Sequence, residues 1–520
     1  MKKVLFTIIV LLTAIVAMAY LYFSKLNTQH AESDLSLYAA VNQSGFVFSF
    51  ENEKSILDIF KGQESFGEII GEDKAKQMQS LKTFLLSSPG INKLIHKQTI
   101  YIGFFSGEKK EINYLLSTQS ENKVSTTQLF QALKSRNILT EPIDNATRIT
   151  LPDSTVFYLG VKDQLILLSN TLQPVKEILS KTFDKKDDSF VSYIKSGSRL
   201  SKNSLAQLYL NFNRIPALLK SIVPGKLTGE LAVLDQQDAF ALLSYNYSKE
   251  RVLFTGTTHL NDPNHYYQSF SQTPPQKITI STIFPEQTAY YSTYAVDSYA
   301  NWRKELDKWF SYHKEDKKRA KVIEELNLKY HLNLEELFPR YFKNQFSNFQ
   351  LNTGEKLAAI NLTNGDKLNQ LLLDLSDNYS DEIKQFKEAD LLYLYFGLPF
   401  KSYKKPYYVI IDNYLVFSNY AATLQFFLDQ YRANKLLINT PGYTNTNNQI
   451  PNNSNISFYL DHQNSIPLLH KNISSPYLKH FQSEKGLKKY ESFVYQLSGD
   501  RGTFQSNILL SKPVVIEKDF

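Results

Sequence analysis

The chain has 520 residues and no cysteine. It therefore has no disulfide bond, no thiol nucleophile, no thiolate metal ligand and no cysteine that could carry a lipid anchor. A strong charge of one sign is also lacking, because the formal net charge is only +7 and Lys2, Lys3 and Lys25 supply part of it. The remainder is too weak to predict a nucleic-acid partner.

Long hydrophobic runs are absent with one exception. From Val4 to Phe23 the chain carries no charged residue, and a helix of that length spans roughly 30 Å, the thickness of a bilayer core. Lys2 and Lys3 place its N-terminal side in the cytoplasm. We expect residues 1–26 to be an uncleaved signal anchor; the alternative is a signal peptide cleaved after the small residues Ala17 and Ala19.

Signatures of catalysis are missing as well. The sequence has no glycine-flanked serine elbow, no phosphate-binding glycine loop and no His-Glu-x-x-His zinc motif. Ser120 with Lys123, and Ser192 with Lys195, match the Ser-x-x-Lys spacing of penicillin-recognising enzymes, but the companion motifs of those enzymes are absent. We therefore expect no enzyme, no catalytic residue and no cofactor.

Two kinds of cluster are candidate binding sites. His259, Asp262 and His265 are the best metal-like set, but they flank a proline in a predicted turn, and a solvated loop explains them better than a metal site does. We expect no metal site. Tyrosine clusters at 266–267, 290–291 and 403–408 could line a groove for a glycan or peptide, whereas packing in half-buried strands is the simpler explanation.

What the sequence does contain is a long internal repeat. TVFYLGVKDQLILLSNTLQPVKEIL (155–179) matches PYYVIIDNYLVFSNYAATLQFFL (406–428), and each predicts a hairpin followed by a helix. Asp163 and Asp412 fall at the two predicted turns, where aspartate tolerates the required backbone geometry. Ser169 and Ser418 follow the hairpins at positions that predict helix N-caps.

The repeat predicts the domain organisation and the fold class. We expect a transmembrane helix in residues 1–26, a first domain at 30–273 and a second, homologous domain at 274–516. Each domain is predicted to be α+β, with a mainly antiparallel sheet and helices packed on one face. The asparagine-rich segment NTPGYTNTNNQIPNNSN (439–455) predicts a flexible loop.

The stretch YAAVNQSGFVFSFENEKSILDIF (38–60) and the Ile-Pro units at Pro216 and Pro467 carry one resemblance. Together with the anchor and the absence of cysteine, they resemble a group of uncharacterised bacterial membrane-anchored envelope proteins of a domain-of-unknown-function family. That resemblance implies the architecture and a position in the bacterial inner membrane, with the C-terminal bulk in the periplasm or extracytoplasmic space. It implies no activity.

These expectations combine into a hypothesis for function. We expect a non-catalytic, membrane-anchored extracytoplasmic protein that binds or scaffolds, with residues 4–23 in the inner membrane, an envelope protein or glycan as partner, and no nucleic acid. One alternative is a periplasmic hydrolase of glycan or peptidoglycan, with Asp153, Asp163, Asp412 and Asp461 as the nearest carboxylates. The other is a lipid carrier, which requires an apolar cavity inside one sheet-helix layer.

Overall fold

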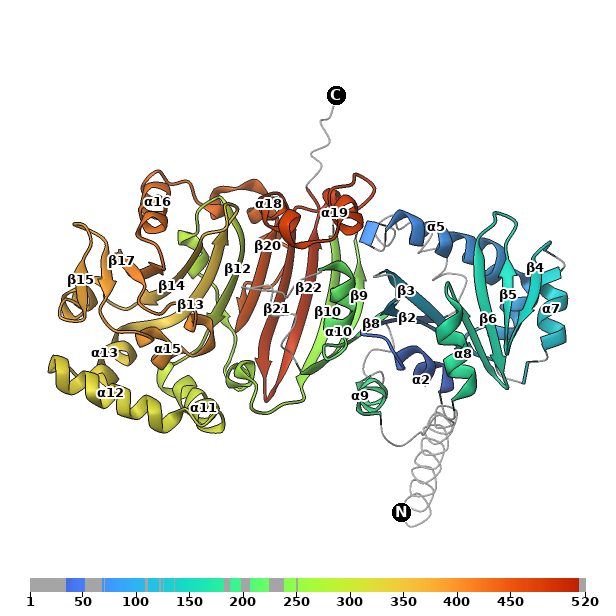
Figure 1. Ribbon diagram of the computed structural model, residues 1–520, viewed down its shortest axis with the longest axis horizontal. Helices are drawn as coiled ribbons and strands as arrows, with labels where there is room; N and C mark the ends of the chain where they lie inside the picture. The colour runs from blue at the N-terminus through green and yellow to red at the C-terminus, as the bar shows by residue number, and fades with distance from the viewer. Residues whose placement is uncertain are drawn as a thin grey trace, which may run out of the picture. The chain divides into compact units, whose positions relative to one another are not determined.

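The computed structural model (Figure 1) describes residues 34–51, 68–69, 71–107, 111–120, 123–124, 126–134, 136–181, 188–197, 206–223, 238–248 and 251–513. Within these ranges no helix combines the length and the apolar character that crossing a bilayer requires. The predicted anchor, residues 1–26, lies outside the described residues and stays a prediction.

The described residues divide into two units. The first takes those within Met1–Glu53, Ser80–Phe104 and Asn113–Lys195, and the second takes those within Lys54–Gln79, Phe105–Ile112 and Ser196–Phe520. The predicted domain boundary between residues 273 and 274 stays a prediction.

The first unit is built mainly from a meander of short strands. β4, β5, β6 and β7 pair in sequence order, β7 also pairs with β3, and β1 pairs with β2, all antiparallel. α8 packs against β6 and β7. The elements that lie wholly or largely in this unit are α2 (Leu35–Val41), β1 (Phe46–Glu51), the π-helical turn η1 (Leu81–Leu86), α6 (Pro89–Ile95), β2 (Thr99–Ser106), β3 (Ile112–Gln119), α7 (Thr126–Lys134), β4 (Leu139–Ile143), β5 (Ala146–Thr150), β6 (Val156–Lys162), β7 (Leu165–Ser169), α8 (Leu172–Ser180) and α9 (Ser189–Gly197).

The second unit holds the larger part of the sheet and most of the helices. Its elements are α5 (Glu72–Ser80), β8 (Gln207–Asn211), α10 (Ile215–Ile222), β9 (Ala239–Tyr247), β10 (Arg251–Leu260), η4 (Tyr266–Phe270), β11 (Gln276–Lys277), η5 (Ile280–Ile283), β12 (Thr288–Ala295), α11 (Tyr299–Tyr312), α12 (Asp316–Tyr330), α13 (Leu334–Tyr341), β13 (Phe342–Leu351), β14 (Lys356–Leu362), α14 (Gly365–Leu371), β15 (Ser376–Asn378), β16 (Lys384–Phe386), α15 (Leu391–Phe396), η6 (Leu398–Phe400), β17 (Tyr407–Ile411), β18 (Tyr414–Ser418), α16 (Ala421–Arg432), η7 (Leu437–Asn439), α17 (Pro441–Asn447), β19 (Asn453–Ser454), β20 (Ile456–Asp461), α18 (His462–Asn472), α19 (Ser475–Phe481), η8 (Leu487–Lys489), β21 (Ser492–Asp500) and β22 (Thr503–Ser511).

The strands of the second unit pair in the order β8, β9, β10, β22, β21, β20, β12, β13, β14, β18, β17, β16 and β15 (Figure 1), and every one of these pairings is antiparallel. β11 and β19 form a separate two-stranded ribbon.

This order shows that the predicted fold class is wrong. β10 belongs to the predicted first domain and β22 to the second, yet the two strands pair directly, from Arg251 opposite Ser511 to Thr258 opposite Phe504. Over the described residues, 20 strands form one mostly antiparallel sheet with helices, rather than two separate domain sheets. Sequence periodicity shows which face of a strand is buried, but it does not show which partner covers the strand's edge.

The prediction that helices cover one face only is also wrong for the second unit. On one face, Tyr291 and Phe349 pack with Leu424 and Phe427 of α16 in a buried cluster. On the opposite face, the Phe346 ring lies 5.4 Å from that of Trp302 in α11, with further contacts to α15. β12 is buried at every residue, as expected for a strand covered on both sides.

The repeated hairpins are confirmed. β6 pairs with β7, and β17 pairs with β18. Asp163 and Asp412 occupy the two turns with φ angles of 54° and 48°, in the left-handed region that aspartate tolerates better than most residues.

The predicted N-cap role of the two repeated serines is wrong. α8 and α16 follow Thr171 and Tyr420 as their N-caps, and neither makes a side-chain cap bond. Instead, the Ser169 hydroxyl donates to the Tyr114 carbonyl, and the Ser418 hydroxyl donates to the Lys356 carbonyl, both at 2.8 Å. The serines therefore fix each hairpin to its neighbouring strand, β3 or β14.

Candidate binding pocket

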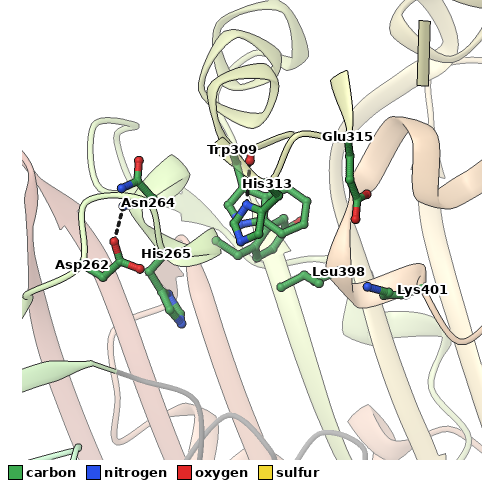
Figure 2. A pocket seen from close by; sticks show the side chains of 9 residues that line it. Asp262, Asn264, His265, Trp309, His313, Glu315, Leu398 and Lys401 are labelled. Atoms are coloured by element: carbon green, nitrogen blue, oxygen red, sulfur yellow. Dashed lines mark hydrogen bonds between the residues drawn. The ribbon is translucent and has the colours of Figure 1, made fainter. Parts of the chain in front are cut away.

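Three connections of the second unit surround a pocket of about 220 Å³ (Figure 2). They are the turn from β10 into η4, the end of α11 with its connection to α12, and η6 with the residue that follows it. The lining residues are Asp262, Asn264, His265, Tyr266, Trp309, His313, Glu315, Leu398 and Lys401.

Aromatic rings that contact one another form part of the pocket wall. Tyr266 is only 1% exposed, its ring meets that of Trp309 edge to face at 5.6 Å, and its hydroxyl donates to the Phe396 carbonyl at 2.5 Å. The ring of His313 lies 4.4 Å from the Trp309 ring, and His313 is exposed. The imidazole of His313 therefore packs against Trp309 and is also open to solvent.

The two histidines are held in opposite tautomers when neutral. Nδ1 of His265 accepts from the backbone N–H of Tyr267 at 3.2 Å, which places the ring proton on Nε2. Nδ1 of His313 lies 2.8 Å from the Trp309 carbonyl, so it donates and leaves Nε2 as an acceptor. Neutral His313 therefore offers its Nε2 to the pocket as an acceptor.

Hydrogen bonds from neighbouring groups of the protein also fix the carboxylates of the pocket. One Asp262 oxygen accepts from the backbone N–H of Asn264 at 2.8 Å, and one Glu315 oxygen accepts from the Tyr393 hydroxyl at 2.5 Å. Burial and the neighbouring Glu315 raise the pKa of Tyr393, which keeps this hydroxyl a donor. Figure 2 shows Asp262 on one side of His313, and Glu315 and Lys401 on the other.

The structure brings together only part of the metal-like set. Asp262 and His265 line the pocket, but His259 lies on β10 opposite Phe240. Over the described ranges of the chain, no group of three or more His, Asp or Glu residues could hold a metal ion.

Within each unit, the two candidate carboxylates of the hydrolase alternative lie far apart. Asp153 and Asp163 flank β6, whose seven residues span roughly 23 Å. Asp412 follows β17 and Asp461 ends β20, and four strand steps separate β20 from β18, about 19 Å in all. Glycosidases need their two carboxyl groups within about 10 Å.

Each of these carboxylates has a local structural role. Asp153 accepts from the Ser80 hydroxyl and the Thr155 N–H, and Asp163 pairs with Lys123 at 3.1 Å. Asp412 accepts from the Tyr431 hydroxyl at 2.5 Å. Asp461 caps α18 by accepting from the Asn464 N–H at 2.9 Å, and burial raises the pKa of its carboxyl.

The Ser-x-x-Lys matches are not brought into catalytic arrangements. Lys123 forms the ion pair with Asp163, and the Lys195 ammonium lies 5.0 Å from the centre of the Tyr38 ring. The tyrosine clusters mostly pack in the core, since Tyr290, Tyr403 and Tyr408 are all buried. Tyr266 is buried as well, and it also lines the pocket.

His462 lies away from the pocket and is almost fully buried. Its Nε2 lies 3.0 Å from the Phe481 carbonyl, its ring stacks on Phe481 at 4.2 Å, and Nδ1 has no partner among the described residues. Burial lowers the pKa of His462 from its usual value of 6.5; the bond to the Phe481 carbonyl offsets part of this shift, and the charge of Lys488 adds to it.

Replacing His462 by Phe should flatten the dependence of stability on pH. Phe212 occupies the matching position after β8, so the aromatic ring is compatible with this type of site. Because the folded-state pKa is lowered, the unfolded wild type binds a proton first as the pH falls through 6.5, and the protein loses stability below that pH. Urea unfolding at pH 7.5 and 5.5 measures this loss.

We expect the His462→Phe variant to lie within about 1 kcal/mol of wild type at pH 7.5 and to lose less stability at pH 5.5. An equal loss in both proteins would show that other groups cause the pH dependence.

No family model matches the chain, and no curated protein or solved structure matches it. The function of the pocket is therefore interpreted from its geometry. Sequence reasoning identified Asp262 and His265 as a cluster. It missed His313, Glu315 and Lys401, which come from two other connections and carry no local motif.

Proposed function

We propose that the protein is a non-catalytic binding protein whose pocket at His313 holds one unit of a glycan. The observation that carries this proposal is the preorganisation of the pocket. Three side chains, those of Asp262, His313 and Glu315, each use one polar atom in a hydrogen bond to a neighbouring group of the protein. This fixes the remaining polar atoms around the exposed His313 ring.

The size and chemistry of the pocket fit a sugar unit. Drug-sized ligands fill roughly 300–1,000 Å³, so a pocket of about 220 Å³ takes something smaller. Sugar hydroxyls can donate to Nε2 of His313 and to the two carboxylates of the pocket, and they can accept from the Lys401 ammonium. The exposed His313 ring can stack against the C–H face of a sugar ring, because aromatic side chains offer apolar faces to ligands.

The cellular setting of this proposal comes from the sequence. The uncharged run from Val4 to Phe23, preceded by Lys2 and Lys3, supports a single-pass anchor in the inner membrane of a bacterium, with the rest of the chain outside the cytoplasm. A glycan of the cell envelope is then the accessible ligand. The separation of Asp153 from Asp163, and of Asp412 from Asp461, favours binding over hydrolysis.

The experiment is titration calorimetry of the purified full-length chain with N-acetylglucosamine and its β-1,4-linked trimer. Asp262→Asn removes the charge but keeps an oxygen that can accept from the Asn264 N–H. His313→Ala removes the ring. A hydrogen bond to a charged group contributes about 1.5–3 kcal/mol, so each variant should bind at least about tenfold more weakly.

Asp412→Asn is the matched control, because it makes the same substitution in a turn outside the pocket, and it should bind like wild type. Absence of sugar binding, or equal binding by all variants, would overturn the proposal. Release of monosaccharide from the trimer would show that the protein is an enzyme instead.

A further inference from the structure

The pocket at His313 has an excess of negative charge when its histidines are neutral. Two carboxylates line it, those of Asp262 and Glu315, and one ammonium, that of Lys401. Figure 2 shows Asp262 on one side of the His313 ring and the other two charged groups on the opposite side. A ligand with a positive charge therefore finds a counter-charge in this pocket.

Glu315 and Lys401 are both held by one aromatic side chain, that of Tyr393. The Tyr393 hydroxyl donates to a Glu315 oxygen at 2.5 Å, and the Lys401 ammonium lies 5.6 Å from the centre of the Tyr393 ring. The two opposite charges therefore lie within about 10 Å of each other, the Debye length at 0.1 M salt, and largely offset one another. The negative charge that is left belongs to the other side of the pocket.

Asp262 has no cationic partner of this kind. One of its oxygens accepts from the backbone N–H of Asn264 at 2.8 Å. The other accepts from no group in the described part of the chain, and it is not among the buried polar atoms, so a ligand can reach it. The Asp262 side chain is therefore fixed by its first oxygen and offers the second, with the charge, to the pocket.

A second cavity offers no comparable charge. Part of its wall comes from the segment 439–455, which the sequence predicted to be a flexible loop. That prediction is wrong, because residues Pro441–Asn447 form α17, and Tyr443 and Thr446 are buried in it. Among the described residues that line this cavity, none is charged. Its volume of about 150 Å³ is far too small for a lipid acyl chain with its headgroup, so the lipid-carrier alternative does not fit it either.

We propose that the sugar unit held in the pocket at His313 carries an unsubstituted amine, whose ammonium group donates to the free oxygen of Asp262. This inference rests on the proposed function, because it names the kind of sugar that the same pocket selects. A hydrogen bond between an ammonium and a carboxylate is stronger than one between neutral groups. An N-acetylated unit keeps the contact with the His313 ring but has no charge for Asp262 to attract.

The experiment compares glucosamine, N-acetylglucosamine and glucose on the full-length chain at pH 7. The three sugars share one ring and differ at one carbon, which bears an ammonium, an amide or a hydroxyl. Tryptophan fluorescence can follow each titration, because Trp309 lines the pocket and the chain's other tryptophan, Trp302, is fully buried. Glucosamine should bind at least about tenfold more tightly than either of the other two sugars.

Two further measurements show whether Asp262 causes this preference. Asp262→Asn keeps an oxygen for the Asn264 N–H but removes the charge, so it should bind glucosamine and N-acetylglucosamine about equally. Asp412→Asn makes the same change in a turn outside the pocket and should keep the wild-type preference. In the wild type, added NaCl should lower the affinity for glucosamine and leave that for glucose unchanged, because salt screens a half-exposed charge pair.

The outcomes separate this inference from the function on which it rests. Absence of binding by all three sugars would overturn the proposed function. Equal affinities of the wild type for the three sugars would overturn the inference alone, because the pocket would still hold a sugar. A preference for glucosamine that survives Asp262→Asn, or that does not change with salt, would also overturn it, because another group would then recognise the amine.

Discussion

Replacing Gly256 by Ala is expected to destabilise the protein by about 3 kcal/mol. Gly256 lies in the middle of β10, opposite Leu243 of β9 and Ser506 of β22. A Cβ at this position would lie 2.0 Å from the Leu242 carbonyl oxygen. That oxygen belongs to the backbone of a paired strand, so it can move away only if the β9–β10 ladder is distorted.

The control for this prediction is Gly442→Ala. Gly442 lies in α17, and the nearest atoms to a Cβ there are those of the Glu491 carboxyl at 3.5 Å or more, an ordinary contact. Alanine favours a helix over glycine by up to about 1 kcal/mol, so this variant should be as stable as wild type or more stable. Urea unfolding of both full-length variants tests the pair, and equal midpoints for Gly256→Ala and wild type would show that β9 moves aside at little cost.

Replacing Glu68 by Gln is expected to cost about 3 kcal/mol, the lower end of the range for breaking a buried ion pair. The Glu68 side chain is 4% exposed and lies 2.7 Å from the Lys489 ammonium and 2.9 Å from that of Lys512. The Tyr490 hydroxyl donates to the same carboxyl at 3.0 Å. A neutral amide would remove the charge that faces both ammonium groups.

The carboxyl of Glu68 should also make the free energy of unfolding depend on pH in the acid range. Burial by itself would raise the pKa of Glu68, but the hydrogen bonds from Lys489 and Lys512 outweigh it, and the pKa falls below its usual value of 4.5. A lowered carboxyl pKa contributes stability that is complete well above pH 4.5 and is lost as the pH falls through the folded-state value. Glu68→Gln should not show this part of the loss.

Glu72→Gln is the matched control for Glu68→Gln. Glu72 also pairs with lysines, Lys76 and Lys485, both at 3.1 Å, but its side chain is 44% exposed. Exposed ion pairs contribute little to stability, so unfolding of this variant should resemble that of wild type. If Glu68→Gln were as mild as Glu72→Gln, the buried carboxyl would have no special role in stability.

The features that local sequence could predict are those set by neighbouring residues. Asp163 and Asp412 marked two hairpin turns correctly, because turn geometry depends on a few adjacent residues. Ser169 and Ser418 were misassigned, since a serine hydroxyl next to a helix start has the same local pattern whether it caps the helix or bonds to a neighbouring strand.

The features that sequence reasoning missed depend on distant partners. Phe346 and Phe349 lie on opposite faces of β13, and only the helices that pack there show that both faces are covered. Lys401 joins His313 in the pocket through two connections far apart in the chain.

The pairing of β10 with β22 also governs when the chain can finish folding. β10 ends at Leu260, but its partner begins at Thr503, and at about 5–20 residues per second the ribosome needs roughly 10–50 s to cover that interval. During this delay the backbone groups along one side of β10 have no strand to bond, and an open edge of this kind recruits other chains. A product that stops before Thr503 keeps this edge of β10 without its β22 partner, so only the finished chain closes it.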